Sequence, residues 1–270
     1  MDIQTTDLEE YFANYDKLTT SVLFIYYCKL GGLGDYIKFF TYVLYYCIKN
    51  NIKMYYLQNV NEIDKYIKIK YNKLYILREN IDKPLIQLRS LNEIIDDNVY
   101  YVVYTPILYS EPVYESIYSL HNIFEFTDEV KDNAKKLLSI SGDYISIHIR
   151  FLDYLLDAFF DDDINNLDNV FKFNQNNICK LIEDNKKKQI VLFSSNMKYK
   201  KKLKEKYDFI NIIDIEIGHL SYIGTDDAFL NTMSEYYIMI NSDCIYCNLL
   251  SAFSKTASMF NDISFNLIKE

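Results

Sequence analysis

A buried strand that leads through a glycine turn into a helix is the feature that most constrains how this chain folds. The strand is expected at Ser21–Cys28 (SVLFIYYC), whose β-branched and aromatic residues are typical of a strand covered on both faces. The turn Gly31–Asp35 (GGLGD) follows, and Asp35 can cap a helix that runs to about Asn50. A second strand is expected at 53–58. Because a helix between two strands joins them in parallel, this half of the chain predicts a parallel sheet covered by helices.

The second half of the chain repeats this alternation. Short strands near 74–77 and 100–104 complete the first half, and the polar stretch between Ser110 and Phe126 is the best candidate for a boundary. Beyond it we expect helices at 128–138, 174–184, 197–207, 226–236 and 251–260, and strands at 144–149, 189–193, 209–213, 237–240 and 263–267. The sequence therefore predicts an α/β protein in which two Rossmann-like domains, 1–125 and 126–270, face a cleft.

Charge and cysteine content restrict the class of protein. With 38 acidic and 29 basic residues the net charge is −9, which argues against a general surface for nucleic acid or anionic membranes. The N-terminal residues are polar and acidic, unlike a leader peptide, and the apolar stretches are too short to span a bilayer. Five scattered cysteines indicate reduced thiols. We therefore expect a soluble protein of the cytoplasm, or of the host cytoplasm if the chain is viral.

Scarce residues are informative because the composition is skewed. Ile, Asn, Lys and Tyr are abundant, as an AT-rich genome of a protist, bacterium or large DNA virus favours, and Gly, Arg and His are rare. Three of the 6 glycines lie in the first turn. There Gly32, Gly34 and Asp35 let the backbone approach a phosphate or a sugar at the start of a helix. The turn matches neither a dinucleotide fingerprint nor a P-loop, and a tight structural turn is the alternative.

The strand that begins at Tyr144 carries the second candidate site. Its sequence YISIHIRFLDY alternates, so His148 and Arg150 point to the same side near the carboxyl end, where ligands bind in open α/β sheets. An arginine in a chain that otherwise uses lysine indicates bidentate recognition of phosphate. The alternative is a structural ion pair between Arg150 and Asp153 beside a hydrogen-bonded His148.

Three further features have simpler explanations. The acidic run at Asp157 and Asp161–Asp163 could be the DxD of a metal-dependent transferase, in which carboxylates hold Mn²⁺ or Mg²⁺ against a nucleotide diphosphate, but a solvated loop explains it as well. The pair Cys244 and Cys247 has no second pair for zinc, so buried thiols are expected. The many tyrosines fit a core. No metal site is predicted.

Four segments in order resemble the superfamily of α1,2-, α1,6- and protein O-fucosyltransferases. The glycine turn is similar to its GGLGN/GGLGD turn, and the segment from His148 to Asp153 is similar to its HxRRxD motif. The strand end at Ser194–Asn196 and the closing segments 227–239 and 251–254 resemble two later motifs. The chain departs from the pattern at Phe151, where the family has a second arginine, and at Asn196, where an aspartate is common.

The resemblance implies a GT-B fold whose C-terminal domain binds GDP-fucose and whose N-terminal domain mainly holds the acceptor. Arg150 would contact the diphosphate and stabilise departing GDP, with His148 beside the ribose and phosphate. The other donor-binding residues that it implies are Gly32, Gly34, Asp35, Ser194, Ser195, Asp227, Ser251 and Ser254. Asp153 would be the general base, with Asp157 as second choice.

The resemblance therefore implies an inverting, metal-independent transfer of fucose or a related sugar from a GDP-sugar to an acceptor hydroxyl. The GDP-sugar would be a substrate and no cofactor is expected. The acceptor would be a glycan or another hydroxyl compound. Two alternatives remain: a metal-dependent DxD enzyme that uses a UDP-sugar, and a carbohydrate-binding or scaffold relative without activity.

Overall fold

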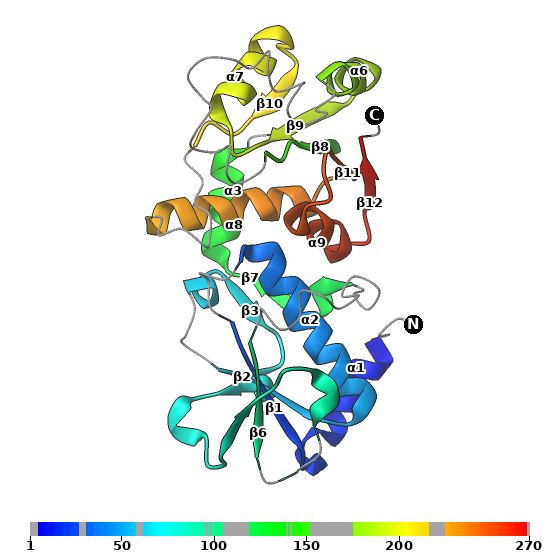
Figure 1. The fold of residues 1–270 in the computed structure, drawn as a ribbon. Coiled ribbons are helices and arrows are strands. Elements are labelled where there is room, and N and C mark those ends of the chain that lie inside the picture. The colour runs from blue at the N-terminus through cyan, green and yellow to red at the C-terminus, as the bar shows by residue number, and fades with distance from the viewer. Residues whose placement is uncertain are drawn as a thin grey trace. The chain divides into compact units, whose positions relative to one another are not determined.

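The computed structural model describes residues 5–26, 31–57, 62–94, 97, 99–104, 119–138, 140, 142–151, 175–215 and 225–268. These residues form two compact units, one from residues up to Glu129 and the other from residues beginning at Val130 (Figure 1). Each unit contains one five-stranded parallel sheet. The predicted α/β class with two Rossmann-like units is therefore confirmed.

The first unit is built around a fully buried strand, as its sequence predicts. Its sheet has the order β4-β2-β1-β6-β5, with β1 at Ser21–Ile25, β2 at Lys53–Leu57, β4 at Tyr75–Ile76, β5 at Leu85–Gln87 and β6 at Tyr100–Tyr104. All five residues of β1 are buried. A separate antiparallel ribbon pairs β3, Ile67–Ile69, with β7, Phe124–Phe126.

Among the described residues, two α-helices accompany this sheet, α1 at Thr5–Asn14 and α2 at Leu33–Asn50. Aromatic side chains fill the space beside α2, where the rings of Phe24, Phe40 and Tyr56 contact one another at centroid distances of 5.7–6.3 Å. Short 3₁₀ turns complete the unit: η1 Tyr15–Lys17, η3 Glu62–Lys65, η4 Asn72–Leu74, η5 Arg78–Asn80, η6 Leu91–Glu93 and η9 Leu120–Asn122.

The second unit has the strand order of a Rossmann half. Its sheet runs β10-β9-β8-β11-β12, with β8 at Tyr144–His148, β9 at Gln189–Phe193, β10 at Ile210–Ile212, β11 at Cys244–Cys247 and β12 at Ser264–Leu267. From the centre the chain moves out through β9 and β10, and then returns to the other side of β8. The direction of winding therefore reverses between β8 and β11, which makes this pair the topological switch point.

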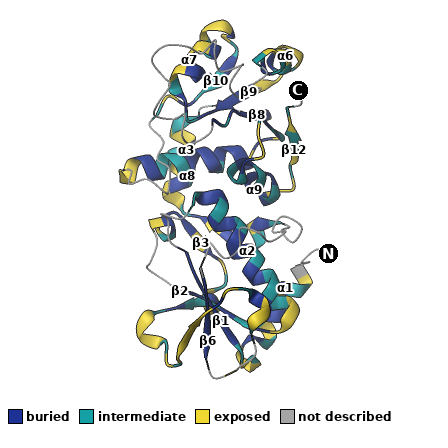
Figure 2. Ribbon diagram, in the orientation of Figure 1, coloured by how far each residue is buried: buried dark blue, intermediate teal, exposed yellow. Residues whose placement is uncertain are grey.

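Helices cover both faces of the second sheet. They are α3 Asp128–Leu137, α6 Gln175–Asp184, α7 Met197–Lys206, α8 Asp226–Ile240 and α9 Ala252–Phe260. Figure 1 shows α6 and α7 on one side of the sheet and α8 and α9 on the other. The α6 and α7 side forms a core in which Ile145, Ile147 and Phe151 are buried. Figure 2 shows buried residues along β8 and β9. On the other side, the Tyr144 hydroxyl donates to the carbonyl of Ile238 in α8.

One predicted strand is wrong. The expected strand at 237–240 belongs to α8, which continues to Ile240, and the strand that follows is β11. The β-branched and aromatic run that favoured a strand packs as a buried helical face, where Ile238, Met239 and Ile240 are all buried. No helix in the part of the chain described above is long and apolar enough to cross a membrane.

Candidate functional site

The carboxyl edge of the second sheet gathers several of the predicted site residues. Because β8, β9 and β11 are parallel neighbours, the segments that follow them emerge at one edge. These segments hold Arg150 after β8, Ser194–Asn196 after β9, and Ser251 after β11. In an open parallel sheet the crevice beside the switch point is where ligands bind.

His148 is the last residue of β8 and lies at the switch point. It pairs in register with Cys247, and its Nδ1 lies 3.7 Å from the Cys247 sulfur. The residue is 8% exposed, and its ring contacts the ring of Phe253 at a centroid distance of 5.8 Å. Burial, together with the positive charge of Arg150, lowers the pKa of His148 to about 3. The imidazole is therefore neutral at physiological pH and can offer hydrogen bonds but no charge.

Arg150 follows two residues later and is partly buried. Its positive charge lowers the pKa of the Cys247 thiol as well as that of His148, although burial raises the thiol's pKa overall. Both groups lie at the end of the β8–β11 pair, so the charge of Arg150 acts on residues of the switch point. Its backbone is held by Asn248, whose Oδ1 accepts from the Arg150 N–H at 2.7 Å and whose Nδ2 donates to the Arg150 carbonyl at 3.0 Å.

Phe151, the departure from the HxRRxD pattern, has a structural explanation. Its side chain is 3% exposed and belongs to the core beneath α6 and α7. Its ring packs against Tyr199 of α7 at a centroid distance of 5.4 Å and an interplanar angle of 77°. In this chain the residue after Arg150 is therefore part of the hydrophobic core.

The two predicted serines, Ser194 and Ser195, lie in the turn between β9 and α7 and have different surroundings. Ser194 is buried and its Oγ accepts from the N–H of Asn196, so it stabilises the turn. Asn196 caps α7, with Oδ1 accepting from the N–H of Tyr199 at 3.0 Å. Within the described part of the chain, Ser195 Oγ and Asn196 Nδ2 are buried without a hydrogen-bond partner. A ligand or water is the usual partner for such groups.

The predicted residues on α8 and α9 differ in their surroundings. Ser251 is the N-cap residue of α9, and its side chain forms no capping hydrogen bond. Ser254 is fully buried, and its Oγ donates to the Cys247 sulfur at 3.3 Å. Asp227 is exposed in the first turn of α8, where its charge complements the helix dipole. Thr225, and not Asp227, caps that helix, accepting from the N–H of Ala228.

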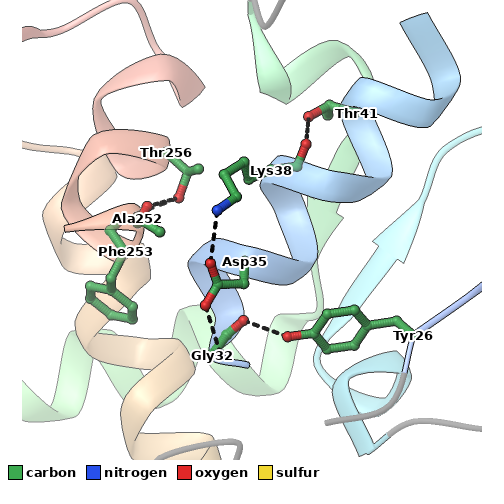
Figure 3. A network of polar contacts seen from close by, with 8 residues as sticks. All are labelled: Tyr26, Gly32, Asp35, Lys38, Thr41, Ala252, Phe253 and Thr256. Atoms are coloured by element: carbon green, nitrogen blue, oxygen red, sulfur yellow. Dashed lines mark hydrogen bonds and ion pairs between the residues drawn. The ribbon is translucent and has the colours of Figure 1, made fainter. Parts of the chain in front are cut away.

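In the first unit, the glycine turn is fixed by its own neighbours (Figure 3). The Tyr26 hydroxyl donates to the carbonyl of Gly32 at 2.9 Å, and one Asp35 oxygen accepts from the Gly32 N–H at 3.2 Å. The other Asp35 oxygen lies 3.1 Å from Lys38 Nζ. Asp35 therefore takes part in capping α2, as predicted, but from position N3: the helix begins at Leu33 after the N-cap Gly32, and Gly34 and Asp35 lie inside its first turn.

Gly31 belongs to the predicted turn but was not among the predicted donor-binding residues, and the turn requires a glycine there. A Cβ atom there would lie 2.9 Å from the Asp35 Cβ and 3.0 Å from the Tyr26 hydroxyl. The signal that could have revealed Gly31 is the buried Tyr26 ahead of the turn. Asn248 was also missed, because an asparagine after a strand carries no motif.

The predicted general bases Asp153 and Asp157 lie outside the described residues, as does the acidic run Asp161–Asp163. Among the residues that the structure does describe, no group of three or more His, Cys, Asp or Glu side chains could hold a metal ion.

No protein-family model matches the chain, and no curated protein matches its sequence significantly. Solved structures do match. A mutant of Arabidopsis thaliana FUT1 in complex with GDP has a TM-score of 0.61 at 11% identity, over 98% of this chain and 74% of FUT1. The NodZ alpha-1,6-fucosyltransferase of Bradyrhizobium co-crystallised with GDP has a TM-score of 0.59 at 11% identity, over 89% and 92%. POFUT1 in complex with GDP has a TM-score of 0.57 at 10% identity, over 92% and 98%. The chain therefore has the GT-B-like α/β fold of these fucosyltransferase structures.

Proposed function

We propose that this protein is an inverting, metal-independent glycosyltransferase that transfers fucose or a related sugar from a GDP-sugar to an acceptor hydroxyl. The observation that carries the proposal is the position of Arg150, beside the neutral His148 at the switch point of the second sheet. The fold is shared with FUT1, NodZ and POFUT1 structures that contain GDP, which supports a GDP-sugar as the donor.

Arg150 has the charge that the leaving group needs. As the bond from the anomeric carbon to the diphosphate breaks, negative charge accumulates on the β-phosphate of GDP. A guanidinium held at the crevice stabilises that charge with two parallel hydrogen bonds. Backbone N–H groups at the start of α9, after Ser251, add positive potential from the helix dipole. His148 and Ser195 contribute neutral hydrogen bonds to the ribose and phosphates.

The acceptor hydroxyl attacks the anomeric carbon from the face opposite GDP, so the configuration at that carbon inverts. Its proton passes to a carboxylate, for which Asp153 is our first choice and Asp157 our second. If this assignment is right, Asp153→Asn should abolish most turnover while the affinity for GDP stays within about twofold of wild type. Within the second unit, the remaining donor contacts are assigned to Ser194, Asp227 and Ser254.

The decisive experiment is a thermal-shift panel of GDP, UDP, CDP and ADP, each with Mn²⁺ and with EDTA. A ligand that binds only the folded state raises the unfolding midpoint by mass action. We expect a shift with GDP that persists in EDTA, followed by turnover of GDP-fucose.

Other outcomes would overturn the proposal. A shift with UDP that requires Mn²⁺ would favour a metal-dependent enzyme that uses the Asp161–Asp163 run. No shift with any nucleotide, combined with glycan binding, would favour a carbohydrate-binding or scaffold protein.

A further inference from the structure

Asn248 lies where the ladder between β8 and β11 ends. The last pair in register is His148 with Cys247, and the Asn248 N–H still donates to the His148 carbonyl at 3.4 Å. Beyond this point the backbones no longer pair. The Asn248 side chain takes over, accepting from the N–H of Arg150 at 2.7 Å and donating to its carbonyl at 3.0 Å.

This arrangement uses both ends of one side-chain amide. An amide carries an acceptor and a donor in one plane, so it can pair with a residue's N–H and C=O as a neighbouring strand would. On the other side of the segment, the N–H of Ile149 donates to the carbonyl of Phe193 in β9 at 2.8 Å. The backbone around Arg150 is thus held from β11 and from β9, although it lies past the end of β8.

We propose that Asn248 is the positioning residue for Arg150, fixing the backbone from which the guanidinium reaches the departing diphosphate. The two hydrogen bonds show that Asn248 holds the Arg150 backbone. The expected effect on the diphosphate rests on the proposed function. Misplacement of a catalytic group by about 1 Å can reduce a rate by about a hundredfold. A residue that holds the Arg150 backbone is therefore expected to affect the diphosphate contacts and to leave contacts with the nucleoside unchanged.

Substitutions distinguish this role from simple packing. Asn248→Ala removes both hydrogen bonds, and Asn248→Asp keeps the acceptor but places a carboxylate oxygen against the Arg150 carbonyl. A matched control is Asn211 of β10, another partly buried asparagine, whose Nδ2 donates to the carbonyl of Ile190 at 3.2 Å within the same sheet. We expect Asn211→Ala to lose one hydrogen bond of the sheet without affecting ligand binding.

The test measures the dissociation constants of GDP and guanosine for each variant. We expect Asn248→Ala and Asn248→Asp to weaken the binding of GDP by about tenfold, the effect of losing one to two hydrogen bonds. The dissociation constant of guanosine should change by less than about twofold. In an Arg150→Ala background, Asn248→Ala should change the affinity for GDP by less than about twofold, because its effect passes through Arg150. Two results would overturn the inference: Asn248→Ala weakens the binding of GDP and of guanosine equally, or it weakens the binding of GDP equally in the wild-type and Arg150→Ala backgrounds.

A second measurement does not depend on any ligand. Amide hydrogen exchange at the Arg150 N–H should be slow in wild type and in Asn211→Ala, and at least about tenfold faster in Asn248→Ala. If wild type binds neither GDP nor guanosine, the proposed function fails, and this exchange rate still decides whether Asn248 holds Arg150. An unchanged exchange rate in Asn248→Ala would refute the positioning role in either case.

Discussion

His148 and Cys247 face each other across the two strands of the switch point, with Nδ1 3.7 Å from the sulfur. Burial acts on both groups in the direction that removes charge, because it lowers the pKa of the imidazole and raises that of the thiol. The thiol also lies 2.8 Å from the carbonyl of Leu249, to which it donates. The end of the β8–β11 pair therefore carries neutral polar groups next to the charge of Arg150.

The first prediction concerns stability against pH. The pKa of His148 is lowered from 6.5 to about 3 in the folded chain. Between these pH values the imidazole is protonated in the unfolded chain and neutral in the folded chain. The free energy of unfolding should therefore fall between pH 6.5 and pH 3, by about 1.4 kcal/mol per pH unit from this group. Above pH 6.5 the imidazole is neutral in both states, so it does not contribute to the pH dependence of the free energy of unfolding.

Urea unfolding of wild type and His148→Gln at several pH values measures this difference. The variant should show a smaller slope below pH 6.5, and His121→Gln, which replaces an exposed histidine, should keep the wild-type slope. Equal slopes in wild type and His148→Gln would show that the imidazole accepts its proton in the folded state.

The second prediction concerns Arg150. Arg150→Lys keeps the charge but loses the planar, bidentate donor, so kcat/KM with GDP-fucose should fall by about a hundredfold, equivalent to about 3 kcal/mol of transition-state stabilisation. The matched control is Arg89→Lys, at an exposed position in the first unit. Steady-state kinetics check the result, and near wild-type turnover of Arg150→Lys would remove Arg150 from the mechanism.

Much of the fold follows from the sequence because its strands are short, apolar and bounded by turns. The predicted segments at 144–149, 189–193 and 263–267 correspond within one residue at each end to β8, β9 and β12. The small strands β3, β5 and β7 have three residues each, too few for an alternating pattern to stand out. In β5 the two apolar residues Leu85 and Ile86 are adjacent and all three residues are exposed, so the segment does not alternate as a half-buried strand does.

The candidate site was predictable only where a side chain is unusual for this composition. Arginine is rare in this chain, and His148 lies at the end of a clear strand, so Arg150 and His148 could both be predicted as site residues. Asn248 could not, because asparagine is abundant here and its role depends on which strand lies beside β8. That neighbour is β11, about a hundred residues later in the chain, and strand order is decided by packing of the whole sheet.

The third prediction concerns Gly31. In Gly31→Ala the new methyl group would meet the Asp35 Cβ at 2.9 Å, and the clash lies with atoms that are held by α2 and by the Tyr26 hydrogen bond. Relief requires a shift of the turn, so we expect a loss of about 1–3 kcal/mol in the free energy of unfolding of the first unit. Chemical denaturation measures this loss. A change below about 0.5 kcal/mol would mean that the turn relaxes freely.

The fourth prediction concerns a buried ion pair in the second unit. Lys200 of α7 is 0% exposed at its side chain and Glu235 of α8 is 5% exposed, with Nζ 3.5 Å from Oε1. The ammonium also donates to the carbonyl of Ile213 at 2.8 Å. Burial raises the pKa of Glu235, and the charge of Lys200 acts in the opposite direction. The pKa of Glu235 is raised overall, and Lys200 limits that rise.

Removing one partner should cost much more than removing both. Lys200→Met leaves a buried carboxylate without its cation, and we expect a loss of about 3–5 kcal/mol in the free energy of unfolding. The double variant Lys200→Met with Glu235→Gln should recover part of that loss, since no uncompensated charge remains. Lys201→Met is the control, because Lys201 pairs with Asp214 at 3.0 Å while both side chains are more than half exposed, and it should change stability by less than about 1 kcal/mol. If Lys200→Met were as mild as Lys201→Met, the charge on Glu235 would not depend on Lys200, and α7 and α8 would be joined by apolar packing alone.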